Sequence, residues 1–138
     1  MSEMNDMIQM LADASEEERA SMLSQRLKML AGQPEEQRIQ SLAGLISAVN
    51  KLKSKKMKPF IATRTKVLMS LSQEEKEALM VGRLKAAKVV GENTHKTDMM
   101  VTLEVAKEMG EDKFKMFVGL LKKTAEKHGL PVPPMDAS

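Results

Sequence analysis

The apolar residues of this chain recur with a period of 19 positions, and this feature constrains the fold more than any other. From residue 15 onward the sequence divides without gaps into six blocks, which open at Ser15, Pro34, Lys53, Ser72, Gly91 and Gly110. The ninth and sixteenth positions are apolar in all six blocks, and the thirteenth is large and apolar in four of them. Residues spaced by four and seven positions share one face of an α-helix, so each block predicts one amphipathic helix.

The first 14 residues fit the same register, because Met4, Ile8 and Leu11 take the positions of the three apolar columns. The sequence therefore predicts seven helices. A single long helix is excluded, since 19 residues turn an α-helix through five circles plus about 100° and would rotate each stripe away from the last. Ordinary helix amphipathicity is an alternative origin of the columns. In the six blocks, the ninth column contains Leu23, Leu42, Ile61, Met80, Met99 and Val118. The thirteenth contains Leu27, Ile46, Thr65, Leu84, Leu103 and Lys122. The sixteenth contains Leu30, Val49, Leu68, Ala87, Ala106 and Ala125.

Residues at the block boundaries predict where the helices begin and end. Ser15 and Ser72 each precede a glutamate by three positions, which is the pattern of a helix-capping box. Pro34 suits a first helical turn, whereas Pro59 falls inside the third block and predicts a short, delayed helix near Pro59 to Ser70. Left-handed C-terminal positions are predicted for Gly32, Gly91, Gly110 and Gly129.

Composition supports an all-α fold, because helix formers dominate, Trp and Tyr are absent and Phe occurs only three times. We expect about seven short antiparallel helices, arranged as an α-solenoid or as a compact helical bundle. A single helical-repeat domain is expected over residues 1–129, followed by a flexible, Pro-rich tail over residues 130–138.

Basic residues gather in the middle of the chain: residues 37–72 contain eight bases and no acid, whereas residues 1–36 contain eight acids and three bases. One interpretation is a polyanion-binding surface that contacts RNA, DNA or an anionic partner. The alternative is local charge balance, in which the returning chain brings the lysines level with Glu16, Glu17 and Glu18. The candidate residues are Lys51, Lys53, Lys55, Lys56, Lys58, Arg64 and Lys66.

An Arg-x-Lys motif recurs at positions twelve and fourteen of three blocks, as Arg26 and Lys28, Arg64 and Lys66, and Arg83 and Lys85. The three arginines predict a basic ladder that grips acidic side chains with forked hydrogen bonds. The alternative is that their methylene groups cover the core while their charges reach water.

Methionine occurs 14 times, and Met1, Met4, Met7 and Met10 recur every three residues. Met4 takes a core position of the register. Met1, Met7 and Met10 lie beside it and are candidates for an adaptable apolar surface that contacts a partner. Core filling and Cu(I) binding by the thioethers are the alternatives.

Catalytic and metal-binding patterns are scarce in this sequence. The chain has no cysteine and two histidines, His95 and His128, which an antiparallel hairpin would bring to one end as a conceivable zinc site. The alternative is that both histidines are exposed loop residues that bind no metal. Nucleophile, phosphate-loop and His-Glu-x-x-His motifs are absent, so we predict no enzyme activity, no catalytic residue, no metal site and no cofactor.

These features predict a non-catalytic helical-repeat module that binds an acidic or amphipathic segment of a partner protein. The alternative is a nucleic-acid or ribosome-associated protein that uses the basic segment of residues 51–66. The N-terminus lacks the basic-then-apolar layout of a signal peptide and no long apolar run is present, so we expect a cytoplasmic protein without membrane partners. The oligomeric state and the identity of the partner stay open.

Overall fold

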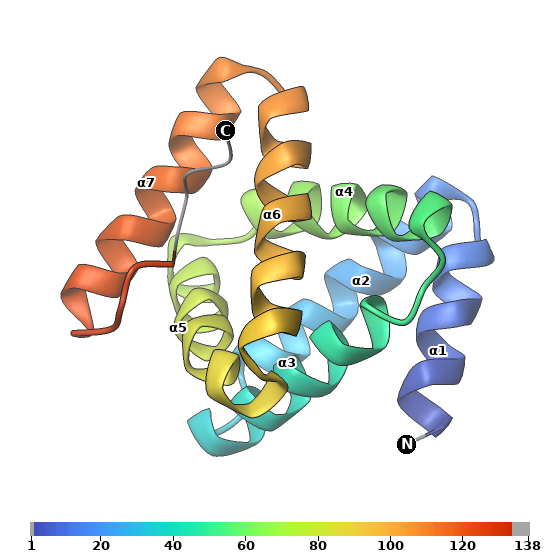
Figure 1. Cartoon of the computed structure of the whole chain (residues 1–138), viewed down its shortest axis with the longest axis horizontal. Coiled ribbons are helices and arrows are strands. Elements are labelled where there is room, and N and C mark those ends of the chain that lie inside the picture. Colours follow the sequence, from blue (N-terminus) through green and yellow to red (C-terminus); the bar gives the residue numbers. More distant parts are fainter. Residues whose placement is uncertain (1, 134–138) are drawn as a thin grey trace.

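The structure, a computed structural model, describes residues 2–133, which form seven α-helices and no strand (Figure 1). The predicted all-α fold is confirmed, and the helices pack against one another as a compact bundle (Figure 1). The helices are α1 (Ser2–Asp13), α2 (Glu16–Ala31), α3 (Glu35–Val49), α4 (Ser54–Ser70), α5 (Gln73–Val90), α6 (Glu92–Glu108) and α7 (Glu111–Lys127).

The predicted apolar stripes point into the core. Every residue of the ninth column is buried except Met4 and Val118, which are half-buried. In the sixteenth column Leu68 and Ala87 are half-buried and the rest are buried, and in the thirteenth only Lys122 is exposed. The register therefore marks the buried face of α1–α6, whereas in α7 the buried residues Phe117 and Leu121 each lie one position before the predicted column.

Two sets of side-chain hydrogen bonds also recur with a shift of 19 residues. Arg19 of α2 donates to the carbonyl oxygens of Leu11, Ala12 and Ala14 at the end of α1, at 3.3, 3.4 and 3.1 Å. Arg38 of α3 donates in the same relative positions to Leu30, Ala31 and Gln33 at the end of α2, at 3.1, 3.1 and 2.6 Å. The last carbonyls of a helix have no partner within the helix, so each arginine fastens the end of the helix before its own.

Both predicted capping boxes are confirmed. The hydroxyl of Ser15 accepts a hydrogen bond from the Glu18 amide at 3.2 Å, and that of Ser72 accepts one from the Glu75 amide at 3.1 Å. Each glutamate side chain accepts in return from the serine amide, so two of the unpaired amides at the start of α2 and of α5 are satisfied.

A positive φ is found at Gly91, Gly110 and Gly129, as the prediction requires, but ψ is 152° at Gly91 and 158° at Gly110, so these two are extended rather than left-handed helical. The prediction is wrong at Gly32, which has a right-handed φ of −88°. The Gly32 amide bonds to the carbonyl of Met29, and the Arg38 guanidinium satisfies the carbonyls of Leu30 and Ala31. A left-handed residue is therefore not needed at this helix end.

The delayed start predicted for the helix near Pro59 is also wrong, because α4 begins at Ser54 and contains Pro59 in its second turn. Proline there removes one amide and leaves the carbonyl of Lys55 without its helical partner. Lys55 is exposed, so water can solvate that carbonyl, and the amides of Lys56 and Met57 still bond to the carbonyl of Lys53. The helix is therefore not interrupted.

The packing of the bundle is dominated by helices that are two apart in the chain, with α3 against α5, α4 against α6 and α2 against α4. Helix α4 runs across the molecule, and α6 passes over it (Figure 1). The buried side chains form two clusters. The first cluster draws mainly on α1–α4 with part of α5, and the second joins α5, α6 and α7.

A close approach between α3 and α5 requires glycine at position 82. A Cβ atom there would lie 2.6 Å from Leu42 Cδ1 and 3.3 Å from Arg38 Cδ, whereas a Cβ atom at Gly119 of α7 meets nothing within 4 Å. We expect Gly119→Ala to raise the free energy of unfolding by up to about 1 kcal/mol, because alanine has the higher helix propensity. Gly82→Ala should stabilise less than Gly119→Ala or destabilise, and urea denaturation of both variants measures the difference. An equal increase in the free energy of unfolding for both variants would contradict the close approach of α3 and α5 at Gly82.

The chain after α7 stays in contact with the bundle as far as the structure describes it. The Leu130 amide bonds to the carbonyl of Ala125 at 2.8 Å and the Gly129 amide to that of Glu126, which forms a Schellman turn. Leu130 packs on the second cluster, and Pro133 is buried. Residues 134–138 of the predicted tail lie outside the described residues.

Candidate functional site

A surface groove of about 330 Å³ lies between the end of α4, the start of α5 and the outer side of α7. Its apolar side chains are Met69, Met116 and Leu120, and Met116 is 57% exposed. Three basic side chains and one amide complete the lining, with no acid among them: Lys76, Lys115, Lys123 and Gln73. The groove is therefore apolar in part and positively charged at its edges.

The sequence of α7 explains why this groove is basic. Phe117, Leu121 and Ala125 form the buried stripe that packs on the second cluster. The acids Glu111 and Asp112 lie in the first turn, and no further acid occurs before Glu126. Acids favour a helix N-terminus, where they face the positive end of the helix dipole. Lysine and methionine therefore occupy the middle of the outer face of α7.

One rim lysine has an acidic neighbour. Lys115 pairs with Glu111 at 3.1 Å one turn earlier on α7, but both side chains are more than two-thirds exposed. Exposed pairs of this kind contribute little, because water screens them. Lys76 and Lys123 form no ion pair with any residue from 2 to 133. The groove keeps a net positive charge.

The predicted basic segment does not form one continuous patch. Lys56 pairs with Asp13 of α1, Lys58 with Glu108 and Glu104 of α6 at 2.6 and 3.4 Å, and Lys66 with Glu16 of α2 at 3.2 Å. Hydrogen bonding to Glu108 raises the pKa of Lys58. These three lysines are therefore engaged in the local charge balance that was the alternative interpretation.

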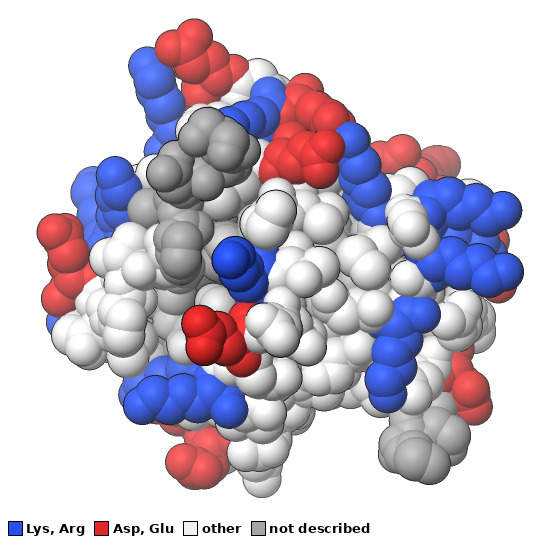
Figure 2. Space-filling model, in the orientation of Figure 1, with Lys and Arg blue, Asp and Glu red and all other residues white. Residues whose placement is uncertain are grey.

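Lys51, Lys53 and Lys55 are exposed, and within the described part of the chain none of them forms an ion pair. Figure 2 shows basic side chains gathered at the edge where α4 begins, bordered by acidic ones. Of the seven predicted positions, these three stay available to a polyanion.

The three arginines of the recurring motif do not form a surface ladder. Arg26 is half-buried and its guanidinium contacts the sulfur of Met7. Arg64 and Arg83 are each 8% exposed, so the prediction that they bind a partner at the surface is wrong. The physical reason is Asp98 of α6, a fully buried carboxylate that pairs with both of them.

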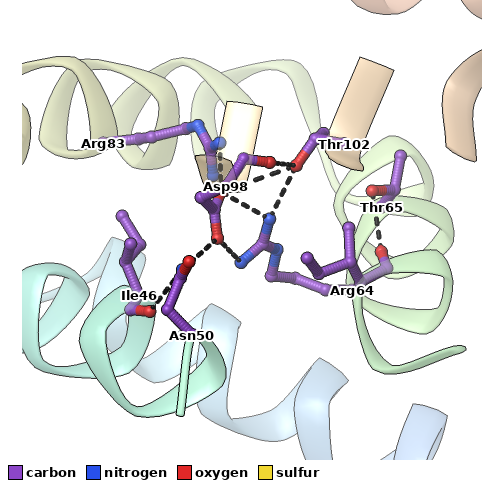
Figure 3. A network of polar contacts seen from close by, with 8 residues as sticks. Ile46, Asn50, Arg64, Thr65, Arg83, Asp98 and Thr102 are labelled. Carbon is purple, nitrogen blue, oxygen red and sulfur yellow. Dashed lines mark hydrogen bonds and ion pairs between the residues drawn. The ribbon is translucent and has the colours of Figure 1, made fainter. Parts of the chain in front are cut away.

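Asp98 is the centre of a buried polar network that joins α3, α4, α5 and α6 (Figure 3). Arg64 donates from two nitrogens to the two carboxylate oxygens, at 3.1 and 2.9 Å, and donates also to the Thr102 hydroxyl at 2.9 Å. Arg83 donates to the same carboxylate from α5, and the Asn50 amide approaches it from α3 at 3.5 Å. Paired hydrogen bonds between arginine and carboxylate fix the geometry as well as the charge.

The network keeps Asp98 ionised. Burial alone would raise the pKa of this carboxyl, but the charges and hydrogen bonds of Arg64 and Arg83 hold it well below its usual value. Burial lowers the pKa of the Arg83 guanidinium, which Asp98 partly offsets. The group contains two guanidinium cations and one carboxylate, so it carries one excess positive charge.

The predicted methionine surface is divided between core and solvent. Met4 and Met7 pack against the first cluster, and Met10 is 54% exposed. Met22 and Met29 of α2, which the N-terminal pattern did not include, are 42% and 50% exposed. Met1 lies outside the described residues.

The two histidines have separate surroundings. His128 lies 2.8 Å from a carboxylate oxygen of Glu77, which Lys127 also contacts. His95 of α6 is half-buried, its Nδ1 atom has no hydrogen-bond partner in the described structure, and burial together with Arg83 lowers its pKa. No group of three or more histidine and acidic side chains that could hold a metal occurs within residues 2–133.

Comparisons with protein-family models, with curated proteins and with solved structures found no match for this chain. None of the helices formed by residues 2–133 is both long enough and apolar enough to cross a bilayer.

Proposed function

We propose that this protein is a non-catalytic interaction module that binds an acidic, amphipathic segment of a partner protein in the groove between α5 and α7. The observation that supports this proposal is the joint presence of an apolar floor and a lysine rim without acids. The apolar residues would hold the apolar face of the partner, and the lysines would pair with its acids. The proposal includes a cytoplasmic location, which the cysteine-free sequence allows.

The lining favours a helical partner with adaptable contacts. Methionine side chains are flexible and polarisable, so Met69 and Met116 can adjust to apolar residues of different shapes. Helix α7 has 17 residues and is about 25 Å long, which matches an amphipathic segment of four to five turns lying along it. The partner would carry apolar residues three, four and seven positions apart, with glutamate or aspartate on both flanks.

Binding of RNA or DNA through Lys51, Lys53 and Lys55 is the second candidate function. The exposure of these three lysines favours it. The engagement of Lys56, Lys58 and Lys66 with acids of α1, α6 and α2 counts against it, because it reduces the charge available to phosphates.

A labelled synthetic peptide tests the proposal. We expect an amphipathic helix with a leucine stripe and glutamate flanks to bind the full chain in a fluorescence anisotropy titration, and its scrambled isomer to bind more weakly. The double variant Lys76→Glu, Lys123→Glu should weaken binding about tenfold or more, because it replaces two attractions with two repulsions at the rim. The matched control Lys51→Glu, Lys53→Glu makes the same change of net charge elsewhere and should leave the peptide affinity nearly unchanged.

Two results would overturn this assignment. Equal losses in both double variants would show attraction by net charge alone rather than a groove. Salt-sensitive binding of single-stranded RNA that only the Lys51→Glu, Lys53→Glu variant abolishes, with no peptide binding, would select the nucleic-acid function instead.

A further inference from the structure

A small internal cavity of about 50 Å³ lies between the two core clusters, next to the buried polar network. Apolar side chains, five leucines among them, form most of its wall, and Arg64, Thr65, Arg83 and Thr102 supply the polar part. A buried water molecule needs about 10–15 Å³ of such space, so the cavity has room for a small ion together with one or more water molecules.

The charges beside this cavity do not balance. Asp98 is the one acid within residues 2–133 that bonds to Arg64 or Arg83, and it faces both guanidinium groups. The other polar partners, Thr102 and Asn50, are neutral. An excess charge in the interior is strongly unfavourable unless a counter-charge lies close by.

One of the residues that line the cavity also has an unused hydrogen-bond donor. The Nε atom of Arg83 is buried and has no partner among the described residues. The Thr102 hydroxyl already donates to the Asp98 backbone carbonyl at 2.7 Å. A buried N–H group without an acceptor is rare in proteins and indicates a bound water or ion.

We propose that this cavity binds a small monovalent anion, which neutralises the second guanidinium and accepts the hydrogen bond of Arg83 Nε. A water molecule would satisfy the donor but leave the charge uncompensated. The largely apolar wall disfavours sulfate, phosphate and other strongly hydrated anions, because it cannot replace the water that such ions lose on entry. Chloride and formate have the charge and size that the cavity accepts.

The effect of chloride on thermal stability tests this proposal in the full chain. We expect the Tm to rise as chloride replaces gluconate at constant ionic strength, in proportion to the logarithm of the chloride concentration once this exceeds the dissociation constant, because gluconate is too large for the cavity. A chloride concentration tenfold above the dissociation constant should raise the Tm by about 5 °C. Formate should act like chloride.

Two substitutions separate binding in the cavity from general salt effects. Arg83→Met removes the second guanidinium and leaves one arginine for one carboxylate, so it should abolish the dependence on chloride. Arg26→Met removes a half-buried arginine that does not line the cavity and should keep the dependence. Identical Tm values of the unmodified chain in chloride and in gluconate would overturn the proposal.

A crystal of the unmodified chain grown in bromide gives a decision even if Arg83→Met does not fold. An anomalous bromide peak within hydrogen-bonding distance of Arg83 Nε supports the assignment. Ordered water alone in the cavity, with bromide present throughout the crystal, refutes it whatever the solution data show.

Discussion

Replacing Asp98 with alanine is expected to lower the free energy of unfolding by about 3–5 kcal/mol, one of the largest losses for any single side chain of this protein. Asp98 is fully buried and neutralises guanidinium groups from two helices. Its removal leaves Arg64 and Arg83 in the interior without a carboxylate partner, and their mutual repulsion adds to the cost. Urea denaturation followed by circular dichroism measures the loss.

The control for this variant is Glu104→Ala on the same helix. Glu104 pairs with Lys58 at the surface, where its side chain is 58% exposed, so its loss should change stability little. Asp98→Asn should lower the free energy of unfolding by nearly as much as Asp98→Ala, since asparagine keeps the shape of the side chain but not its charge. An Asp98→Ala variant as stable as Glu104→Ala would contradict the buried network.

The same carboxylate should make stability depend on pH in the acid range. The pKa of Asp98 is lower in the folded chain than in the unfolded chain, so the folded state favours the ionised form. Its contribution is therefore fully present above about pH 4, the value of an unperturbed aspartate, and is lost as the pH falls below it. Asp98→Asn should remove this part of the pH dependence.

Replacing Leu23 with alanine is expected to cost about 2–5 kcal/mol, because it deletes a side chain from the centre of the first cluster and leaves a cavity. Leu23 of the ninth column is 1% exposed, and Leu84 of the thirteenth column, which belongs to the second cluster, is 8% exposed. Leu84→Ala should fall in the lower part of that range. Met29→Ala on the same helix as Leu23 is the control, because Met29 is 50% exposed.

Chemical denaturation of the three variants checks the register directly. Near-neutral effects of both leucine substitutions would show that the predicted columns do not mark the core. A loss of unfolding free energy in Met29→Ala as large as that in Leu23→Ala would also show that the columns do not mark the core.

Local features of the fold were predictable from the sequence. The stripe containing Leu23, Leu27 and Leu30 and the capping boxes at Ser15 and Ser72 depend on contacts within one or two helical turns, so their spacing carries the information. Pro59 was misleading because a single lost hydrogen bond on an exposed part of α4 does not outweigh the packing of the rest of that helix.

The partners of the basic residues were not predictable in the same way, since they come from helices far apart in the chain. Lys58 pairs with Glu108, which is 50 positions away in the sequence, and Arg64 pairs with Asp98, which is 34 positions away. One signal was available: Asp98 precedes a core position of α6 and Thr102 lies one turn later, so both flank the apolar stripe. An acid at that place predicts a buried basic partner.

The groove also had no signature in the sequence. Met69, Lys76 and Lys123 belong to three helices, and each is unremarkable in its own segment. Only the packing of α7 against α5 brings these residues to one surface. Interaction surfaces of this kind are properties of the assembled bundle.

The separation of the buried side chains into two clusters has a consequence for how the molecule opens. Helix α7 packs mainly against α5 and α6, and its buried residues belong to the second cluster alone. It can detach while α1–α4 stay closed, and such partial opening costs less free energy than complete unfolding. We therefore expect limited proteolysis to cleave within α7 before it cleaves α2–α4.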